Sequence, residues 1–177
     1  MIAKRCLTLA LLASAFALPS LLHHTLLHVV TPSIPPGWYF VERFGSPHVG
    51  EYVVACLPTS IALLGRRRGF LIPGDCPSDV APLVKVLAAA AGDTVRISPD
   101  GVFVNGNRVA ASPASRDSRG IPLFPQHVGT YHIQARTVFL LGTSTHSWDS
   151  RYFGALSSHS IIGRAHPLII NPSAVPQ

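Results

Sequence analysis

Residues 94–110 read TVRISPDGVFVNGNRVA, and this stretch decides the class of fold. Three short runs of β-forming residues alternate in it with two turn signals, at 98–101 and at 105–107. Val, Ile, Thr and Phe favour strands, and Asn-Gly between two such runs is a strong signal for a β-hairpin. The stretch therefore predicts short strands joined by tight turns.

The same alternation of short β-runs and turns extends over most of the chain. Helical periodicity is scarce, and after the N-terminal segment we expect one short helix at most, around Ser150–Leu156. The expected strands are Trp38–Arg43, Glu51–Cys56, Phe70–Ile72, Val84–Leu87, Thr94–Ile97, Val102–Val104, Arg108–Ala110, His132–Gly142 and Ser160–Ala165. Many short strands with Gly and Pro turns predict a mostly β fold, a folded-over β-barrel or sandwich.

The chain has 177 residues, which is enough for one domain with its own core. We expect this single β-rich domain to span residues 31–170, with a hairpin and a small cap at about 98–130. Residues 171–177 are expected to form a loose tail.

Residues 1–30 are expected to be an apolar leader. Lys4 and Arg5 precede a run from Cys6 to Leu22 that is interrupted only by small polar residues and Pro19. Two interpretations stay open: an uncleaved membrane anchor with its basic end in the cytoplasm, or a secretory signal cleaved near Ala15-Phe16-Ala17. Both place the rest of the chain outside the cytoplasm.

The overall charge gives little support to a nucleic-acid partner. The formal net charge is +6 in a chain with only 12% charged residues, and the longest basic run is Arg66-Arg67-Arg68, which we interpret as a solvated turn. His23, His24 and His28 have no acidic residue or cysteine at ligand spacing, so we expect neither a metal nor a cofactor.

Cys56 and Cys76 are the two cysteines that follow the leader. In an oxidising compartment an even pair predicts a disulfide, here closing the loop that carries the three arginines. Two buried free thiols are the alternative.

Ser33 lies in a loop that is stiffened by prolines, Thr31-Pro32-Ser33-Ile34-Pro35-Pro36-Gly37. Proline fixes φ, so such a loop can present one hydroxyl in a defined pose, although an ordinary proline-rich linker has the same composition. Thr31 is close enough in sequence to help bind an oxyanion beside the Ser33 backbone N–H.

Lys85 is the only lysine besides Lys4, and it stands in the apolar run Pro82–Ala91. Burial disfavours the charged form of lysine and lowers its pKa, so a buried lysine can act as a general base, whereas arginine cannot. A serine hydroxyl needs such a base to attack an amide. A lysine on an edge strand at the surface is the alternative.

Asp149 and Arg151 stand two residues apart in a chain with eight acidic residues. On a strand they share one face and can form a bidentate pair, or a surface ion pair of little value. Ser147 would lie on the same face, where its hydroxyl can orient Lys85. A Ser-His-Asp triad built on Ser33, one histidine and Asp149 is a weaker alternative, because no histidine stands in a motif.

Taken together, these segments resemble the signal peptidase I superfamily of serine–lysine peptidases. The chain contains a serine box at 31–39, a lysine box ending in Gly92-Asp93-Thr94-Val95, and the box Ser147–Gly154. The details are most similar to the members that act in plasmid conjugal transfer, including Gly74-Asp75-Cys76-Pro77. Two departures are Gly142-Thr143-Ser144-Thr145, where general signal peptidases carry Gly-Asp-Asn-Arg, and Val29, where many relatives carry Asn.

The resemblance implies a serine endopeptidase with Ser33 as nucleophile and Lys85 as general base. Thr31 would contribute to the oxyanion site, Ser147 would orient Lys85, and Asp149 with Arg151 would brace it. The implied substrate is a conjugative pilin precursor, which would be trimmed at the periplasmic side of the inner membrane, with hydrolysis and cyclisation as the two open outcomes. The implied further partners are mating-pair formation proteins. A general signal peptidase and a non-catalytic β-scaffold in a conjugation or secretion complex are the alternatives.

Overall fold

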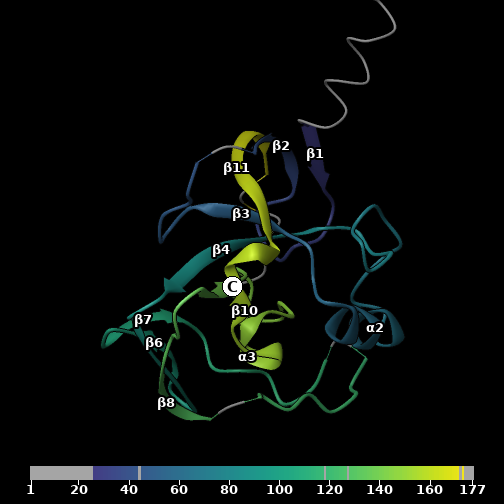
Figure 1. Ribbon diagram of the computed structural model, residues 1–177. Helices are drawn as coiled ribbons and strands as arrows, with labels where there is room; N and C mark the ends of the chain where they lie inside the picture. Colours follow the sequence, from purple (N-terminus) through teal and green to yellow (C-terminus); the bar gives the residue numbers. More distant parts are fainter. Residues whose placement is uncertain (1–25, 44, 118, 127, 172, 174–177) are drawn as a thin grey trace, which may run out of the picture.

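A computed structural model describes residues 26–43, 45–117, 119–126, 128–171 and 173, and within them the strands form two antiparallel sheets (Figure 1). The larger sheet has seven strands in the order β1-β2-β11-β3-β4-β9-β10, and the smaller has four in the order β7-β6-β5-β8. The strands are β1 (Leu26–Val29), β2 (Gly37–Glu42), β3 (Tyr52–Ala55), β4 (Leu83–Ala90), β5 (Thr94–Ser98), β6 (Gly101–Val104), β7 (Asn107–Ala110), β8 (Gly129–His132), β9 (Thr137–Leu141), β10 (Leu156–Ser157) and β11 (Ile161–Ile170). Two short α-helices, α2 (Thr59–Arg67) and α3 (Ser150–Phe153), and the 3₁₀ turn η1 (Ser158–Ser160) complete the described elements. The expected mostly β fold is confirmed.

The small sheet is the region that residues 94–110 predicted. β5 pairs with β6 from Val95↔Val104 to Ser98↔Gly101, and β6 pairs with β7 across the Asn105-Gly106 turn. Asn105 and Gly106 both have positive φ, the geometry that this two-residue turn requires. Val95, Ile97 and Val102 are buried, because alternate side chains of each strand face the same core.

Strand β4 connects the two halves of the large sheet. Its first half pairs with β3, where Lys85 lies opposite Val53, and its second half pairs with β9. The register with β9 shifts between Leu87 and Ala89, the mark of a bulge, which bends a strand and increases its twist. Lys85 therefore lies on an interior strand of the sheet, paired with β3 and one residue before the stretch that pairs with β9.

Helix α2 was not expected, and Arg66 and Arg67 belong to its last turn instead of to a solvated turn. Gly65 explains why its sequence is a weak helix signal. A Cβ at this position would lie 2.6 Å from atoms of Leu71 and Trp148, so the residue must be glycine for the helix to pack there. Glycine lowers helix propensity by about 1 kcal/mol relative to alanine. The tertiary contact therefore outweighs the local preference.

Four further expectations differ from the structure. The strand expected at Phe70–Ile72 is wrong, because these residues belong to the loop between α2 and β4. The single strand expected at His132–Gly142 is wrong, because β8 ends at His132 and β9 begins at Thr137 after a turn at Arg136, whose φ is 61°. Strand β11 extends to Ile170 instead of ending at Ala165, since it continues along β2. Residues 26–29, expected within the leader, form β1 and pair with β2.

The rest of the expected leader, residues 1–25, lies outside the described residues, as do 172 and 174–177 of the expected tail. Within the part of the chain that the structure describes, no helix has the length and apolar character needed to span a membrane.

Cys56 and Cys76 are joined by a disulfide with their Cα atoms 5.5 Å apart. The bridge ties the end of β3 to the loop before β4, and α2 lies within the closed segment. Cys76 also belongs to the main apolar core, with Leu57, Leu71 and Trp148. The disulfide thus holds α2 and residues 70–72 against the large sheet.

Candidate active site

Ser33 lies in a turn between β1 and β2 that is anchored on both sides. Its carbonyl oxygen accepts hydrogen bonds from the backbone N–H of Thr143 at 2.7 Å and from Thr143 Oγ1 at 3.3 Å. The next side chain, Ile34, is fully buried, and the Tyr39 hydroxyl donates to the carbonyl of Pro35 at 2.6 Å. Hence the Ser33 backbone is fixed while its side chain stays partly exposed.

Lys85 is almost completely buried, with 2% of its surface exposed. Its Nζ donates to Ser147 Oγ at 2.8 Å. Burial lowers the pKa of Lys85 to about 8; nearby Asp149 opposes this change, and nearby Arg151 adds to it. A substantial fraction of this amine is therefore neutral near pH 8, as a general base must be.

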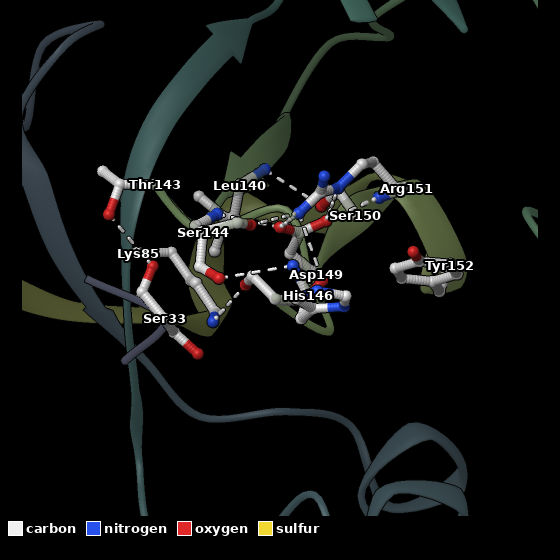
Figure 2. A network of polar contacts seen from close by, with 12 residues as sticks. Ser33, Lys85, Leu140, Thr143, Ser144, His146, Asp149, Ser150, Arg151 and Tyr152 are labelled. Carbon is white, nitrogen blue, oxygen red and sulfur yellow. Dashed lines mark hydrogen bonds and ion pairs between the residues drawn. The ribbon is translucent and has the colours of Figure 1, made fainter. Parts of the chain in front are cut away.

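Ser33 and Lys85 line the same cavity, although they are 52 positions apart. Figure 2 shows the two side chains next to each other, with the dashed line from Lys85 leading away from Ser33. Within the described part of the chain, Lys85 Nζ donates its hydrogen bond to Ser147 Oγ, and no hydrogen bond joins Lys85 to Ser33. This apolar cavity has a volume of about 210 Å³, and its lining also includes Val30, Thr31, Phe70, Ile72, Leu83, His146 and Trp148.

The Asp149–Arg151 pair is buried and bidentate (Figure 2). Arg151 Nε and Nη2 donate to the two Asp149 carboxylate oxygens at 2.8 Å each, and neither residue is exposed. Burial alone would lower the pKa of Arg151, but the hydrogen bond and charge of Asp149 raise it, so Arg151 stays charged. A surface ion pair is thereby excluded.

The sequence predicted that Asp149 and Arg151 lie on a strand, and this prediction is wrong. Asp149 is the N-cap of α3 and accepts the Arg151 backbone N–H at 3.1 Å, while Arg151 lies within the helix. Arg151 Nη2 also donates to the carbonyls of Ser144 and Ser147, at 3.0 and 3.2 Å. We call the Asp149–Arg151 pair the clamp. It fixes the backbone of Ser147, whose hydroxyl contacts Lys85.

Gly142 is a site residue that the motifs did not reveal. A Cβ there would lie 2.1 Å from Ser147 Oγ and 2.7 Å from the carbonyl oxygen of Ser33, so only glycine allows these segments to meet. Its N–H donates to Asp149 Oδ2 at 2.8 Å. Gly142 and Thr143 belong to the stretch that departs from general signal peptidases, and here they anchor both Asp149 and the Ser33 loop.

Ser150 was also not predicted as a site residue, because its side chain binds a backbone N–H of a distant strand, a contact that leaves no motif in the sequence. Its buried hydroxyl accepts the N–H of Leu140 at 2.9 Å, tying α3 to β9.

Thr31, expected near an oxyanion, is exposed and lines the same cavity as Ser33. No group of three His, Cys, Asp or Glu side chains is arranged as metal ligands within the described ranges.

A second cavity, of about 200 Å³, opens at Ser33 on another side. It shares Ser33, Phe70, His146 and Trp148 with the apolar cavity. Its remaining lining includes the charged side chains Arg116 and Asp117 and is completed by Pro32, Ala114, Leu123, Ser144 and Ser147. A peptide that passes Ser33 thus has room in two directions.

Comparison with known proteins assigns the family. A family model described as signal peptidase, peptidase S26, matches residues 2–169. A probable conjugal transfer protein TraF of Sinorhizobium fredii (strain NBRC 101917 / NGR234) is 36% identical over 143 residues, which cover 79% of this chain and 74% of that protein. The chain therefore belongs to the signal peptidase family, peptidase S26, which confirms the resemblance stated above.

Two further relatives carry similar names. The conjugal transfer protein TraF of Agrobacterium tumefaciens (strain 15955) is 36% identical, over 78% of this chain and 79% of that protein. A plasmid transfer protein TraF of Escherichia coli is 34% identical, over 78% and 80%. Among solved structures, a signal peptidase I from Enterococcus faecalis V583 aligns with a TM-score of 0.38 and 19% identity, covering 68% of this chain and 97% of that one.

Proposed function

We propose that this chain is a serine endopeptidase in which Ser33 is the nucleophile and Lys85 the general base. The observation that carries the proposal is a buried lysine, with its pKa lowered to about 8, lining the same cavity as a serine on a fixed turn. Membership of the S26 family supports the serine peptidase class.

The reaction begins when Ser33 Oγ attacks the scissile carbonyl carbon and its proton passes to neutral Lys85 Nζ. The resulting oxyanion is held by the Ser33 backbone N–H together with Thr31. The C–N bond then breaks, Lys85 returns the proton to the leaving amine, and an ester to Ser33 remains. Water, or the amine of a substrate, attacks this ester and releases Ser33.

Ser147 and the Asp149–Arg151 pair are positioning residues in this mechanism. Ser147 Oγ holds Lys85 Nζ at 2.8 Å, and Arg151 holds the carbonyl of Ser147. Lysine has four rotatable side-chain bonds, so a fixed acceptor limits the positions of its amine. The clamp is proposed to keep Lys85 within reach of Ser33.

The proposed substrate is a conjugative pilin precursor, because the curated relatives quoted above are named as conjugal or plasmid transfer proteins. The proposed location is the periplasmic surface of the inner membrane, among mating-pair formation proteins. Large apolar side chains that are exposed on β1, β2 and β11 support a membrane surface: Leu26, Trp38, Phe40, Leu168 and Ile169.

The test is mass spectrometry of the pilin precursor from the same transfer system, co-expressed with wild type, Ser33→Ala or Lys85→Met. Methionine keeps most of the length of lysine without its amine, so the variant controls for packing. We expect a shortened pilin with wild type alone, and a mass one water below the linear product if a pilin amine resolves the ester. Processing that survives both substitutions contradicts the dyad.

An unprocessed pilin with all three proteins would contradict the substrate, and cleavage of an unrelated exported precursor would then favour a general signal peptidase. If neither precursor is processed by wild type but deletion of the chain still abolishes transfer, the non-catalytic scaffold is favoured instead.

A further inference from the structure

Five arginines belong to two segments that meet beside the second cavity, whose lining includes Arg116. Arg66 and Arg67 lie at the C-terminal end of α2, and Arg68 follows them. Arg116 and Arg119 lie in the segment between β7 and β8, which we call the cap. We call these five residues the arginine surface. Arg119 Nη2 donates to the carbonyl of Arg68, and Arg68 Nη1 donates to the carbonyl of Pro122 at 2.9 Å, so α2 and the cap are joined.

The arginine surface has far more positive than negative charge. The carboxylate that its members contact is Asp117, which is buried and lies 3.9 Å from Arg68 and 3.7 Å from Arg119. Arg66 and Arg67 are exposed, and neither guanidinium group has a hydrogen bond or ion pair with another described residue. Five guanidinium groups against one carboxylate leave a strong excess of positive charge at the surface.

Helix stability explains only part of this arrangement. Cations near the C-terminus of a helix interact favourably with its dipole, which accounts for Arg66 and Arg67. It does not account for Arg116 and Arg119, which belong to a different segment, and of which Arg119 donates a hydrogen bond to the carbonyl of Arg68. Like charges that repel one another are retained where they attract an anionic partner.

The arginine surface is continuous with the catalytic centre. Arg116, Asp117 and Ser33 all line the second cavity. The acyl part of a substrate needs a dry enclosure for its ester, and the first cavity, whose lining holds Lys85 but no arginine or carboxylate, supplies it. The second cavity is then left for the peptide that follows the scissile bond, which brings this peptide to Arg116.

We infer that the arginine surface binds acidic residues of the substrate on the carboxyl-terminal side of the scissile bond. This inference rests on the proposed peptidase function and adds a specificity for negative charge to it. Guanidinium groups bind carboxylates through paired hydrogen bonds, which matches side chains of Asp and Glu or a nearby C-terminal carboxylate. The pairs are exposed, so they contribute modestly each and weaken with salt.

Anionic lipid is a less suitable partner for this surface. Strands β1, β2 and β11, which carry exposed apolar side chains suited to contact with a membrane, lie at the top of the view in Figure 1, whereas α2 lies at the lower right. A bilayer in contact with these strands would therefore meet a different part of the molecule from α2. A peptide can reach both regions through the cavities at Ser33.

The test uses synthetic peptides that span the cut site found by mass spectrometry, with the two residues after the cut as Glu-Glu or as Gln-Gln. Binding is measured by fluorescence anisotropy on full-length Ser33→Ala, so no turnover is needed. The variant is Arg66→Gln with Arg67→Gln. The control is Arg108→Gln on β7, which Figure 1 places on the opposite side of the molecule from α2.

We expect the Glu-Glu peptide to bind about three- to tenfold more tightly than the Gln-Gln peptide at low salt. This preference should disappear in the double variant, persist in the control and shrink toward 1 M salt. Equal binding of the two peptides, or a preference that survives the double substitution, would overturn the inference, whatever the fate of the Ser33–Lys85 dyad.

A vesicle experiment separates the lipid explanation. Wild type and the double variant are mixed with phosphatidylglycerol or phosphatidylcholine vesicles. Unchanged vesicle binding in the double variant is expected. A loss of phosphatidylglycerol binding, with no peptide preference in wild type, would assign the arginine surface to lipid and overturn the inference.

Discussion

Two of the carboxylate–guanidinium pairs among the described residues have the same chemistry and opposite surroundings. Asp149 and Arg151 are fully buried beside Lys85, and Asp149 Oδ2 lies 2.8 Å from Arg151 Nη2. Glu42 and Arg164 lie on neighbouring strands β2 and β11, 2.6 Å apart, with their side chains 36% and 21% exposed. The distances are similar, so the comparison shows that solvent exposure and the further partners decide what an ion pair does.

The buried pair forms hydrogen bonds with several backbone groups of the candidate active site. Each of its hydrogen bonds goes to a neighbour that the site needs, among them Gly142 N–H and the carbonyls of Ser144 and Ser147. The exposed pair shares its charges more loosely. Glu42 also contacts His166, and Arg164 also contacts Glu51 at 3.5 Å, in a network that water can enter.

The largest expected effect is from breaking the buried pair. Asp149→Ala leaves Arg151 charged and buried and removes the acceptor of Gly142 N–H, so we expect a loss of about 3–5 kcal/mol in the free energy of unfolding. Urea unfolding followed by circular dichroism measures it. Glu42→Ala is the matched control and should shift the midpoint far less. Similar shifts in the two variants would contradict the role of burial.

The second effect concerns pH and the buried amine beside the clamp. Lys85 has a pKa of about 8 in the folded protein, below the ordinary value of 10.5, so between these values the unfolded chain binds more protons and stability rises with pH. Below pH 8 both states are protonated and the full cost of burying the charge, about 3 kcal/mol, is present.

Lys85→Met removes this cost. We therefore expect the variant to be more stable than wild type at pH 7, with the difference fading as pH rises from 8 to 10.5. Unfolding curves of both proteins at a series of pH values measure the difference, and the comparison cancels the contribution of every other titrating group, since both proteins share these groups. A difference that is constant over this range would show that Lys85 has an ordinary pKa.

The smallest effect is expected at the exposed pair. Interaction with His166, followed by the charge of Arg164, holds the pKa of Glu42 below its ordinary value, against an opposing effect of desolvation. Glu42→Gln should therefore change the unfolding midpoint little at neutral pH, and the small change should vanish in 1 M salt because surface charges are screened. A large, salt-independent loss would place this pair in the same class as Asp149–Arg151.

Much of the fold and the candidate site could be predicted from local patterns. The Asn105-Gly106 turn predicted the hairpins of the small sheet, because its backbone preference acts within a few residues. Lys85 in an apolar run predicted a buried amine, and the structure describes it as such. Helix α2 could not be predicted, because Gly65 is selected by contact with Leu71 and Trp148 and weakens the local helix signal.

The sequence by itself determined a mostly β chain, its family and the residue types that a serine–lysine peptidase needs, since turn preferences, alternation and short motifs act over neighbouring residues. Only the tertiary structure decided which groups meet. It placed Ser33 and Lys85 at one cavity, used Gly142 to let three segments approach, and joined the arginines of α2 to those of the cap. The physical reason is that burial and close packing depend on residues far apart in the chain, and they turn an ordinary ion pair into a clamp and an ordinary lysine into a candidate base.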